Sequence, residues 1–250
     1  MSLITVNEEK CIKCEQCINE CPSGVLKMGV MGPEEVENNF CIACGHCVAV
    51  CPTEAIDNKK TPLAEQIDAK DFPKLNAEQA EHFLRARRSI RSYQDKSVSR
   101  EKLTKLVDIA RLAPTGSNSQ GISYLVVEDK ILIERAVKLT IRIMEKSPLK
   151  NALKVVISAY REDGIDSILR GAPNLIITTA NKDFSNAKAN SISCLTYLEL
   201  FAPSLGLGTC WAGFFGYCAG MKGSPMLKLF NIPEGKIITA AVMVGYPKYT

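Results

Sequence analysis

From residue 77 onward, segments with helical spacing of apolar residues alternate with short runs of β-branched residues. Helices are predicted at 78–88 after a capping Asn76, at 98–114 ending at Pro114, at 129–146, and at 190–206 ending at Gly206. Strands are predicted at 122–129, 172–181 and 236–247, where β-branched and aromatic residues cluster. This alternation indicates an α+β or α/β domain.

The first sixty residues contain an internal repeat. CIKCEQCINECP begins at residue 11, and CIACGHCVAVCP begins thirty residues later with the same cysteine spacing. A disulfide framework would not need two such tight runs and would require an oxidising compartment. Zinc is the competing metal, but zinc sites use two C-x-x-C pairs that are usually separated by a longer loop. The third cysteine at the same spacing and the following Cys-Pro favour iron–sulfur chemistry.

This spacing is similar to that of bacterial dicluster ferredoxins, and the resemblance covers residues 1–60. In such domains the cysteine before proline binds the cluster of the other copy. The resemblance therefore implies two 4Fe–4S clusters with crossed ligands: Cys11, Cys14, Cys17 and Cys51 for one, and Cys41, Cys44, Cys47 and Cys21 for the other.

The charge distribution also separates the two parts of the chain. Residues 1–60 contain 9 acidic and 5 basic side chains, whereas residues 61–250 contain 18 acidic and 26 basic ones. The basic excess is either ordinary surface charge or a sign of an anionic cofactor or substrate. It is too thinly spread to predict nucleic-acid binding. Polar residues and prolines at 61–76 predict a linker, which gives the domains 1–60 and 77–250.

Three segments of the second domain carry candidate chemistry. RARRSIRSY at 85–93 is either a solvated basic helix end or a phosphate site, since guanidinium groups suit phosphate oxygens. APTGSNSQG at 113–121 is a turn or a loop whose amides meet a ring with mixed donors and acceptors. GLGTCWAGFFG at 206–216 permits close backbone approach but is not a Rossmann fingerprint.

In this order, and with VGYP at 244–247, these segments resemble the nitroreductase family of FMN oxidoreductases. The resemblance runs from about Glu78 to Pro247. It implies an α+β sandwich, with a central and mostly antiparallel sheet flanked by helices, and a homodimer with FMN at its interface. The implied FMN-binding residues are Arg87, Arg88, Ser89, Arg91, Ser117, Asn118, Gln120, Gly213, Phe214 and Lys248.

Together these features predict an FMN-dependent oxidoreductase that receives single electrons through two 4Fe–4S clusters. Its acceptor would be a flat electrophile, a nitroaromatic or a quinone, and its donor an external low-potential protein such as ferredoxin or flavodoxin. Two alternatives stay open: an electron-transfer or redox-sensing module without its own substrate, and a reductase driven by NAD(P)H. Because no apolar run reaches membrane-spanning length and oxygen bleaches such clusters, we expect a protein of an anaerobic cytoplasm.

Overall fold

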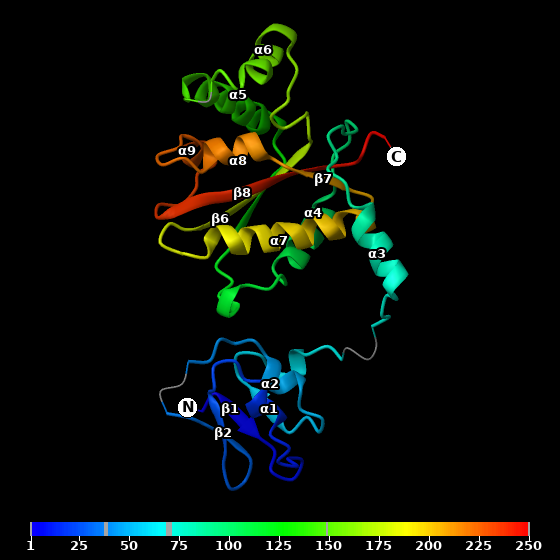
Figure 1. Cartoon of the computed structure of the whole chain (residues 1–250), viewed down its shortest axis with the longest axis vertical. Helices are drawn as coiled ribbons and strands as arrows, with labels where there is room; N and C mark the ends of the chain where they lie inside the picture. The colour runs from blue at the N-terminus through cyan, green and yellow to red at the C-terminus, as the bar shows by residue number, and fades with distance from the viewer. Residues whose placement is uncertain (1, 38–39, 69–71, 149, 250) are drawn as a thin grey trace. The chain divides into compact units, whose positions relative to one another are not determined.

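The computed structural model describes residues 2–37, 40–68, 72–148 and 150–249. The chain divides into two compact units: unit 1 is Met1–Leu75 with Ser117–Ser119, and unit 2 is Asn76–Gly116 with Gln120–Thr250 (Figure 1). Residues 69–71 of the predicted linker lie outside the described residues. No helix in the described ranges is long and apolar enough to cross a membrane.

Unit 1 is a structural duplication as well as a sequence repeat. Its one-turn helices α1 and α2 lie thirty residues apart, and so do its strands β2 and β4. β1 pairs with β4 and β2 with β3, both antiparallel, so each pair joins one copy to the other. The elements are β1 (Ile4–Val6), α1 (Gln16–Asn19), β2 (Leu26–Met28), β3 (Pro33–Glu35), α2 (His46–Ala49), β4 (Ile56–Asn58) and the 3₁₀ helix η1 (Leu63–Glu65).

The core of unit 1 is small. Ile4, Leu26 and Ile56 pack with Val25 and the side chain of Cys17. A unit of this size buries too little apolar surface to be stable on hydrophobic burial alone, and such domains usually need a metal or other cross-link. The folding of unit 1 is therefore expected to depend on what its cysteines bind.

Unit 2 alternates helices and strands along the chain. Its elements are α3 (Ala77–Ala86), α4 (Arg100–Ala110), η3 (Gly116–Asn118, shared with unit 1), β5 (Ser123–Val127), α5 (Lys130–Lys146), α6 (Lys154–Asp163), β6 (Asn174–Asn181), α7 (Ala187–Phe201), η4 (Ala202–Leu205), β7 (Gly208–Trp211), α8 (Gly213–Ala219), α9 (Met226–Leu229) and β8 (Lys236–Gly245).

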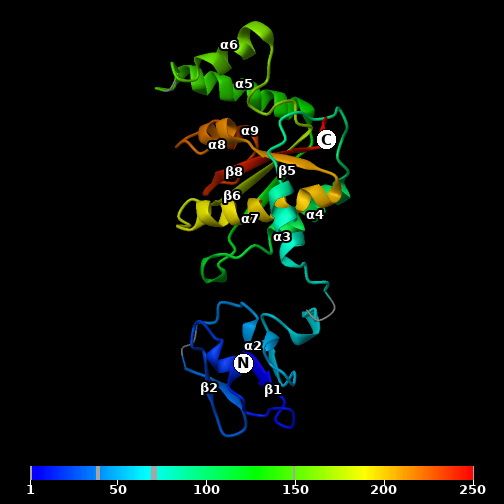
Figure 2. The same cartoon turned by 45° about the vertical axis from the view of Figure 1, so that its right-hand side comes forward.

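The strands of unit 2 form an antiparallel sheet covered by helices on both faces. Within the described residues its order is β5-β6-β8-β7. Helices α4 and α7 cover one face, and α5, α8 and α9 cover the other (Figures 1 and 2). Successive residues of β6 alternate between the two cores: Leu175 and Ile177 pack toward α5 and α8, and Ile176 packs toward α7. This architecture confirms the predicted α+β sandwich.

The helices and strands predicted in unit 2 are present, but α6, α9 and the two elements of the glycine-rich segment were not predicted. The strands at 122–129, 172–181 and 236–247 correspond to β5, β6 and β8, and the helices at 98–114, 129–146 and 190–206 correspond to α4, α5 and α7 with η4. The sequence did not predict β7 or α8. Their glycines weaken both helix and strand propensity, and packing against β8 and α5 compensates.

Candidate functional site

Left-handed backbone conformations curl the two cysteine loops of unit 1. Lys13 and Glu15 have φ of 54° and 62°, and their repeat equivalents Ala43 and Gly45 have φ of 53° and 76°. A residue with positive φ between successive cysteines turns the chain so that the flanking thiols point to the same side. Both copies share this strained pattern, and three of its four residues are not glycine. Because such strain is usually kept where it serves a function, the pattern indicates that the loop shape serves a ligand.

The loops enclose two cavities, and each cavity is lined by cysteines from both copies. Among the residues that line one cavity are Cys11, Cys14, Cys17 and Cys51. Among those that line the other are Cys21, Cys41, Cys44 and Cys47. These are the two crossed sets that the ferredoxin resemblance implies. All eight thiols are free, as are the buried Cys194, Cys210 and Cys218.

Each cavity offers four cysteine thiols as its donor set. Among the described residues, no three His, Cys, Asp or Glu side chains are placed to hold one metal ion. A 4Fe–4S cluster carries its four thiolates at the corners of an iron–sulfide core, so its ligands lie around a space rather than at a point. The donor set of each cavity, four cysteines, fits such a cluster.

The environments of the thiols differ within these sets. Burial raises the pKa of Cys17 to about 11, aided by the neighbouring thiol of Cys51. Burial also acts to raise the pKa of Cys51, but N–H groups of Ala55 and Thr53 outweigh it and the pKa is lowered. Cluster ligands must be thiolates, so these N–H donors favour the binding form of Cys51.

In unit 2, the segment after α3 is held by β7 and by the C-terminal residues. Ser89 forms a parallel bridge with Thr209, and the Ile90 N–H donates to the Thr209 carbonyl at 2.8 Å. Further along, Tyr93 pairs with Pro247. The arginine-rich segment is thereby fixed beside the start of α8.

This arrangement forms a cavity of about 480 Å³, which is within the usual size range of cofactor sites. Four of the predicted FMN-binding residues line it: Ser89, Arg91, Gly213 and Phe214. A Cβ added to Gly213 would meet nothing within 4 Å, so the backbone there is open to a ligand. The remaining lining residues are Ser167, Ile168, Arg170, Cys210, Trp211 and Met243.

Sequence reasoning missed Arg170, a second guanidinium in this cavity. The loop that carries it is organised by Asp166, whose carboxylate accepts the N–H groups of Ile168, Leu169 and Gly171 at 2.9 to 3.0 Å. Arg170 itself has a left-handed backbone, with φ of 57°. The available signal was Asp166 followed by Gly171, which is typical of a tight turn, but the sequence does not say where that turn lies in the fold.

Arg91 and Arg170 give the cavity positive charge where their side chains line it. In the described part of the chain neither guanidinium forms a salt bridge with a carboxylate. Burial raises the pKa of Tyr93, and the charges of both arginines oppose that shift. Two arginines without an acidic partner suit an anionic group such as a phosphate.

A buried carboxylate holds one of the side chains that line the cavity. Glu199 of α7 is 5% exposed and accepts the Trp211 Nε1–H at 2.6 Å and the Thr209 hydroxyl at 3.1 Å. Burial raises the Glu199 pKa, although these two donors and the charge of Arg87 oppose the shift. Glu199 therefore fixes Trp211, the single tryptophan of the chain, against the cavity.

The other predicted residues lie outside this cavity's lining in the described residues. Arg87 is half-buried and Arg88 is exposed. The Lys248 ammonium lies 5.7 Å from the centroid of the Tyr249 ring, while its backbone N–H donates to the Ser92 carbonyl. FMN contacts for these three residues stay predictions.

The predicted ring-binding loop is divided between the two units. Ser117 and Asn118 group with unit 1, in which the Asn118 amide donates to the carbonyl groups of Ile42 and Ala43 at 2.9 and 2.7 Å. Gln120 groups with unit 2, and its N–H donates to the Thr115 hydroxyl at 3.0 Å. Their contacts with a flavin ring also stay predictions.

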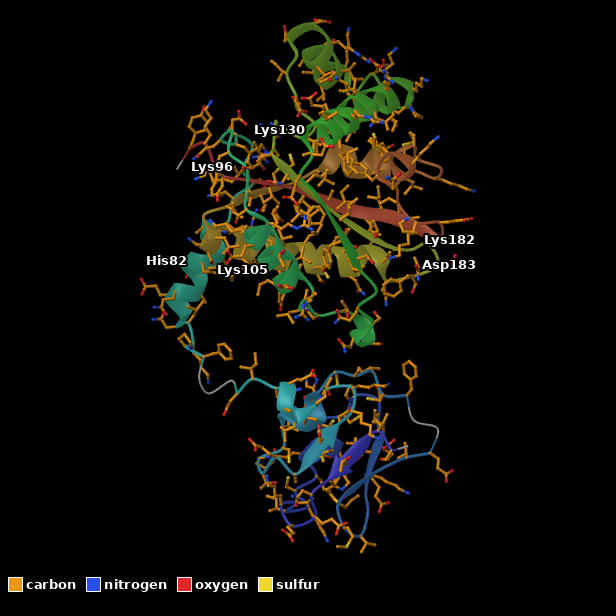
Figure 3. All side chains as sticks on the ribbon, turned by 180° about the vertical axis from the view of Figure 1, so that it is seen from behind. His82, Lys96, Lys105, Lys130, Lys182 and Asp183 are labelled. Carbon is orange, nitrogen blue, oxygen red and sulfur yellow. The ribbon has the colours of Figure 1, made fainter. Side chains whose placement is uncertain are left out.

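Neither histidine of the chain is buried in a site. His46 is exposed on α2, and His82 is exposed on α3, as Figure 3 shows. The chemistry of the site therefore depends on arginine, serine, backbone groups and thiols.

Comparison with known proteins supplies the deciding observation. Residues 84–246 match the nitroreductase family, which is more than half of the chain. The chain belongs to the nitroreductase family. Residues 3–52 match the 4Fe-4S dicluster domain, which places that domain before the nitroreductase domain in one chain.

Two archaeal relatives are each 30% identical to this nitroreductase-family chain. One, from Methanothermobacter thermautotrophicus, aligns over 66% of this chain and 75% of its own length. The other, from Archaeoglobus fulgidus, aligns over 65% of this chain and 82% of its own. Both carry the provisional name NADH dehydrogenase/NAD(P)H nitroreductase.

Solved structures show the same fold. A nitroreductase with bound FMN from Bacteroides fragilis has a TM-score of 0.58 at 22% identity, covering 69% of this chain and 89% of its own. A nitroreductase with bound FMN from Desulfitobacterium hafniense has a TM-score of 0.57 at 21% identity, covering 71% and 92%.

Proposed function

We propose that this nitroreductase-family protein is an FMN-dependent oxidoreductase supplied with electrons by two 4Fe–4S clusters in its own N-terminal domain. Its substrate would be a flat electrophile, a nitroaromatic or a quinone, and its donor an external low-potential carrier such as ferredoxin or flavodoxin. The single observation that carries the proposal is the cavity that gathers Ser89, Arg91, Gly213 and Phe214.

The residues that line this cavity form two groups, one that carries positive charge and one that would face the flavin ring. Arg91 and Arg170, with the Ser89 hydroxyl, would bind the FMN phosphate, because guanidinium groups and hydroxyls are good donors to phosphate oxygens. The open backbone at Gly213 and Phe214 would lie against the ring, with Trp211 excluding water from one side. Solved structures with bound FMN support this cofactor for the family fold.

The remaining predicted contacts belong to the same proposal. Arg87, Arg88 and Lys248 would add positive charge near the phosphate, and Ser117, Asn118 and Gln120 would meet the ring. When bound, FMN can accept single electrons and deliver a hydride, whereas iron–sulfur clusters move electrons one at a time. That difference is a physical reason to place both groups in one chain.

The two cysteine-lined cavities support two clusters rather than one. Each cavity has four thiols, three from one copy of the repeat and the fourth from the other copy. In this proposal the clusters also join the two halves of unit 1, whose own apolar core is small.

A second candidate function is the same enzymatic reduction with NAD(P)H as the electron donor. The names of the two archaeal relatives favour it, since both mention NAD(P)H nitroreductase activity. The clusters would then receive electrons from the flavin instead of supplying them. An electron-transfer or redox-sensing module without a substrate of its own is the third possibility.

Anaerobic turnover with alternative donors tests the proposal. Reduced ferredoxin, NADH and NADPH are each offered with a nitroaromatic or a quinone, for the natural protein and for Cys14→Ser, which removes a thiol of the first cavity. We expect ferredoxin-driven reduction in the natural protein and its loss in Cys14→Ser, with FMN content unchanged.

The other outcomes distinguish the candidates. Equal rates with NADH and with ferredoxin, both unaffected by Cys14→Ser, would show that NAD(P)H is the donor and that the clusters are not the supply route. No reduction of either substrate with any donor would favour the module without a substrate.

A further inference from the structure

The two copies of the repeat differ at one position beside the proposed clusters. Met28 ends β2 and Asn58 ends β4, thirty residues later. Met28 lines the cavity of Cys11, Cys14, Cys17 and Cys51, whereas Asn58 lines the cavity of Cys21, Cys41, Cys44 and Cys47. Equivalent places in the duplicated fold therefore hold a thioether in one copy and an amide in the other.

The Asn58 amide is held in one orientation. Its side chain is in a residue that is 2% exposed, at the end of a strand that pairs with β1. Its Oδ1 accepts the backbone N–H of Lys60 at 2.9 Å. Because the oxygen is engaged by that donor, the NH₂ group is the part that faces the cavity.

That NH₂ group is directed at two thiols of the same set. Asn58 Nδ2 lies 3.8 Å from Cys47 Sγ and 3.9 Å from Cys41 Sγ. Donation to sulfur is longer than donation to oxygen because sulfur is larger. The Met28 thioether, by contrast, is only a weak acceptor and has no hydrogen to donate.

Backbone donors reach both sets, and in the set that contains Cys51 they gather on that thiol, which receives N–H groups of Ala55, Thr53 and Ile56. The Ala43 N–H donates to Cys41 Sγ at 3.4 Å in one set, and the Ala55 N–H donates to Cys51 Sγ at 3.1 Å in the other. Each loop also carries a lysine ammonium on a backbone carbonyl: Lys60 on Cys41 and Lys13 on Val30.

A hydroxyl group also lies beside Cys51. Thr53 Oγ1 lies 3.8 Å from Cys51 Sγ, and its repeat equivalent Ser23 lines the other cavity. The buried amide of Asn58 differs from these donors because it reaches two thiols of its set and because the equivalent position in the other copy, Met28, has no donor.

We propose that Asn58 raises the reduction potential of the cluster held by Cys21, Cys41, Cys44 and Cys47 above the value that this cluster would have with methionine in its place. This inference rests on the proposed function, because it requires both clusters. A reduced cluster carries one more negative charge, and a hydrogen bond to its thiolate sulfur stabilises that charge. The electron that reduces this cluster would come from the external low-potential donor, with no bond or proton exchanged.

Anaerobic redox titration of the full chain, followed by electron paramagnetic resonance, tests the assignment. Two one-electron transitions are expected in the natural protein. In Asn58→Met one transition should fall by about 59 mV, which corresponds to a tenfold change in the reduction equilibrium, and the other should stay. In the reciprocal variant Met28→Asn the other transition should rise and the first should stay.

Iron content separates the failure of this inference from the failure of the proposed function. If the natural protein lacks two clusters, the proposed function itself is wrong. If it holds both, and Met28→Asn or an iron-replete Asn58→Met leaves the potentials unchanged, the inference is overturned. Should Asn58→Met lose its iron, Met28→Asn decides alone, because it adds a donor and removes no contact of Asn58.

Discussion

At the scale of single residues, two arginines and one carboxylate define the cavity of unit 2. Arg91 and Arg170 lie on loops far apart in the sequence and face the same space. Glu199 accepts the indole N–H of Trp211 and so fixes this side chain, which lines the cavity. These groups have opposite roles, because the arginines are available to a ligand and the carboxylate is already bound by protein donors.

Arg170→Gln tests the anion-binding role. We expect FMN to bind about 10- to 150-fold more weakly, because a hydrogen bond with a charged group is worth about 1.5–3 kcal/mol. The affinity is measured by flavin fluorescence as FMN is added to protein stripped of flavin. Arg161→Gln is the matched control: it removes the same charge from α6, where Arg161 pairs with Glu145 at 2.8 Å. Equal affinity of the two variants would contradict the assignment.

Glu199 predicts a pH dependence of stability. Since burial raises its pKa in the folded state, the folded protein holds this proton more tightly than the unfolded chain. Its contribution to the free energy of unfolding therefore falls as pH rises from the ordinary value of 4.5 through the raised pKa. Urea unfolding followed by Trp211 fluorescence should show this fall in the natural protein and a flatter profile in Glu199→Gln. An identical slope for both proteins would show that another group is responsible.

At the scale of elements, helices α3 and α5 begin with good caps but differ in packing. Asn76 and Gln79 form a reciprocal capping box at α3, which has no buried residue. Asp129 accepts the N–H groups of Ile131 and Leu132 at α5, whose inner face packs into the core. The cap of α3 therefore stabilises only that helix, whereas the cap of α5 stabilises a helix that also packs into the core against the sheet.

Replacing each cap by alanine should separate local from global stability. Either change removes about 1 kcal/mol of capping energy. For Asp129→Ala we expect the free energy of global unfolding to fall by that amount. For Asn76→Ala we expect faster hydrogen exchange confined to α3 amides and little change in global unfolding, because α3 contributes no buried side chain. A global loss from Asn76→Ala would mean that α3 packs against something in solution.

Sequence reasoning reached the elements and part of the site for identifiable reasons. Strands β6 and β8 were recognisable because burial on both faces requires continuous apolar runs. Ser89, Arg91, Gly213 and Phe214 were found through motifs. Arg170 was not, because only the fold brings its loop beside Arg91, and no local pattern in the sequence encodes that distance.

In unit 1 most of the prediction, including the sets of cysteines, was based on the sequence repeat. The crossed sets of cysteines followed from a resemblance, and the cavities are lined in the same way. The contrast between Met28 and Asn58 was readable from the thirty-residue offset, but its meaning depends on the orientation of the amide, which only the structure provides.

At the scale of the whole molecule, we expect a homodimer. Exposed apolar residues lie on α7, where Ile192 is 45% exposed and Tyr197 is 41% exposed. Analytical ultracentrifugation should give twice the mass of one chain for the natural protein. Ile192→Glu should shift it toward the monomer, whereas Ile131→Glu, the same change at a 69% exposed position on α5, should not. A monomeric natural protein would contradict this expectation.

The central claim is that one chain holds a flavin and two iron–sulfur clusters. Its most direct test is the cofactor content of protein purified without oxygen: iron, acid-labile sulfide and FMN per chain, with the absorption spectrum. The account predicts about eight irons and about eight sulfides per chain from two four-iron clusters, about one FMN, and flavin bands on a broad absorbance that oxygen bleaches. Zinc in place of iron, about four irons in place of eight, or no flavin would contradict it.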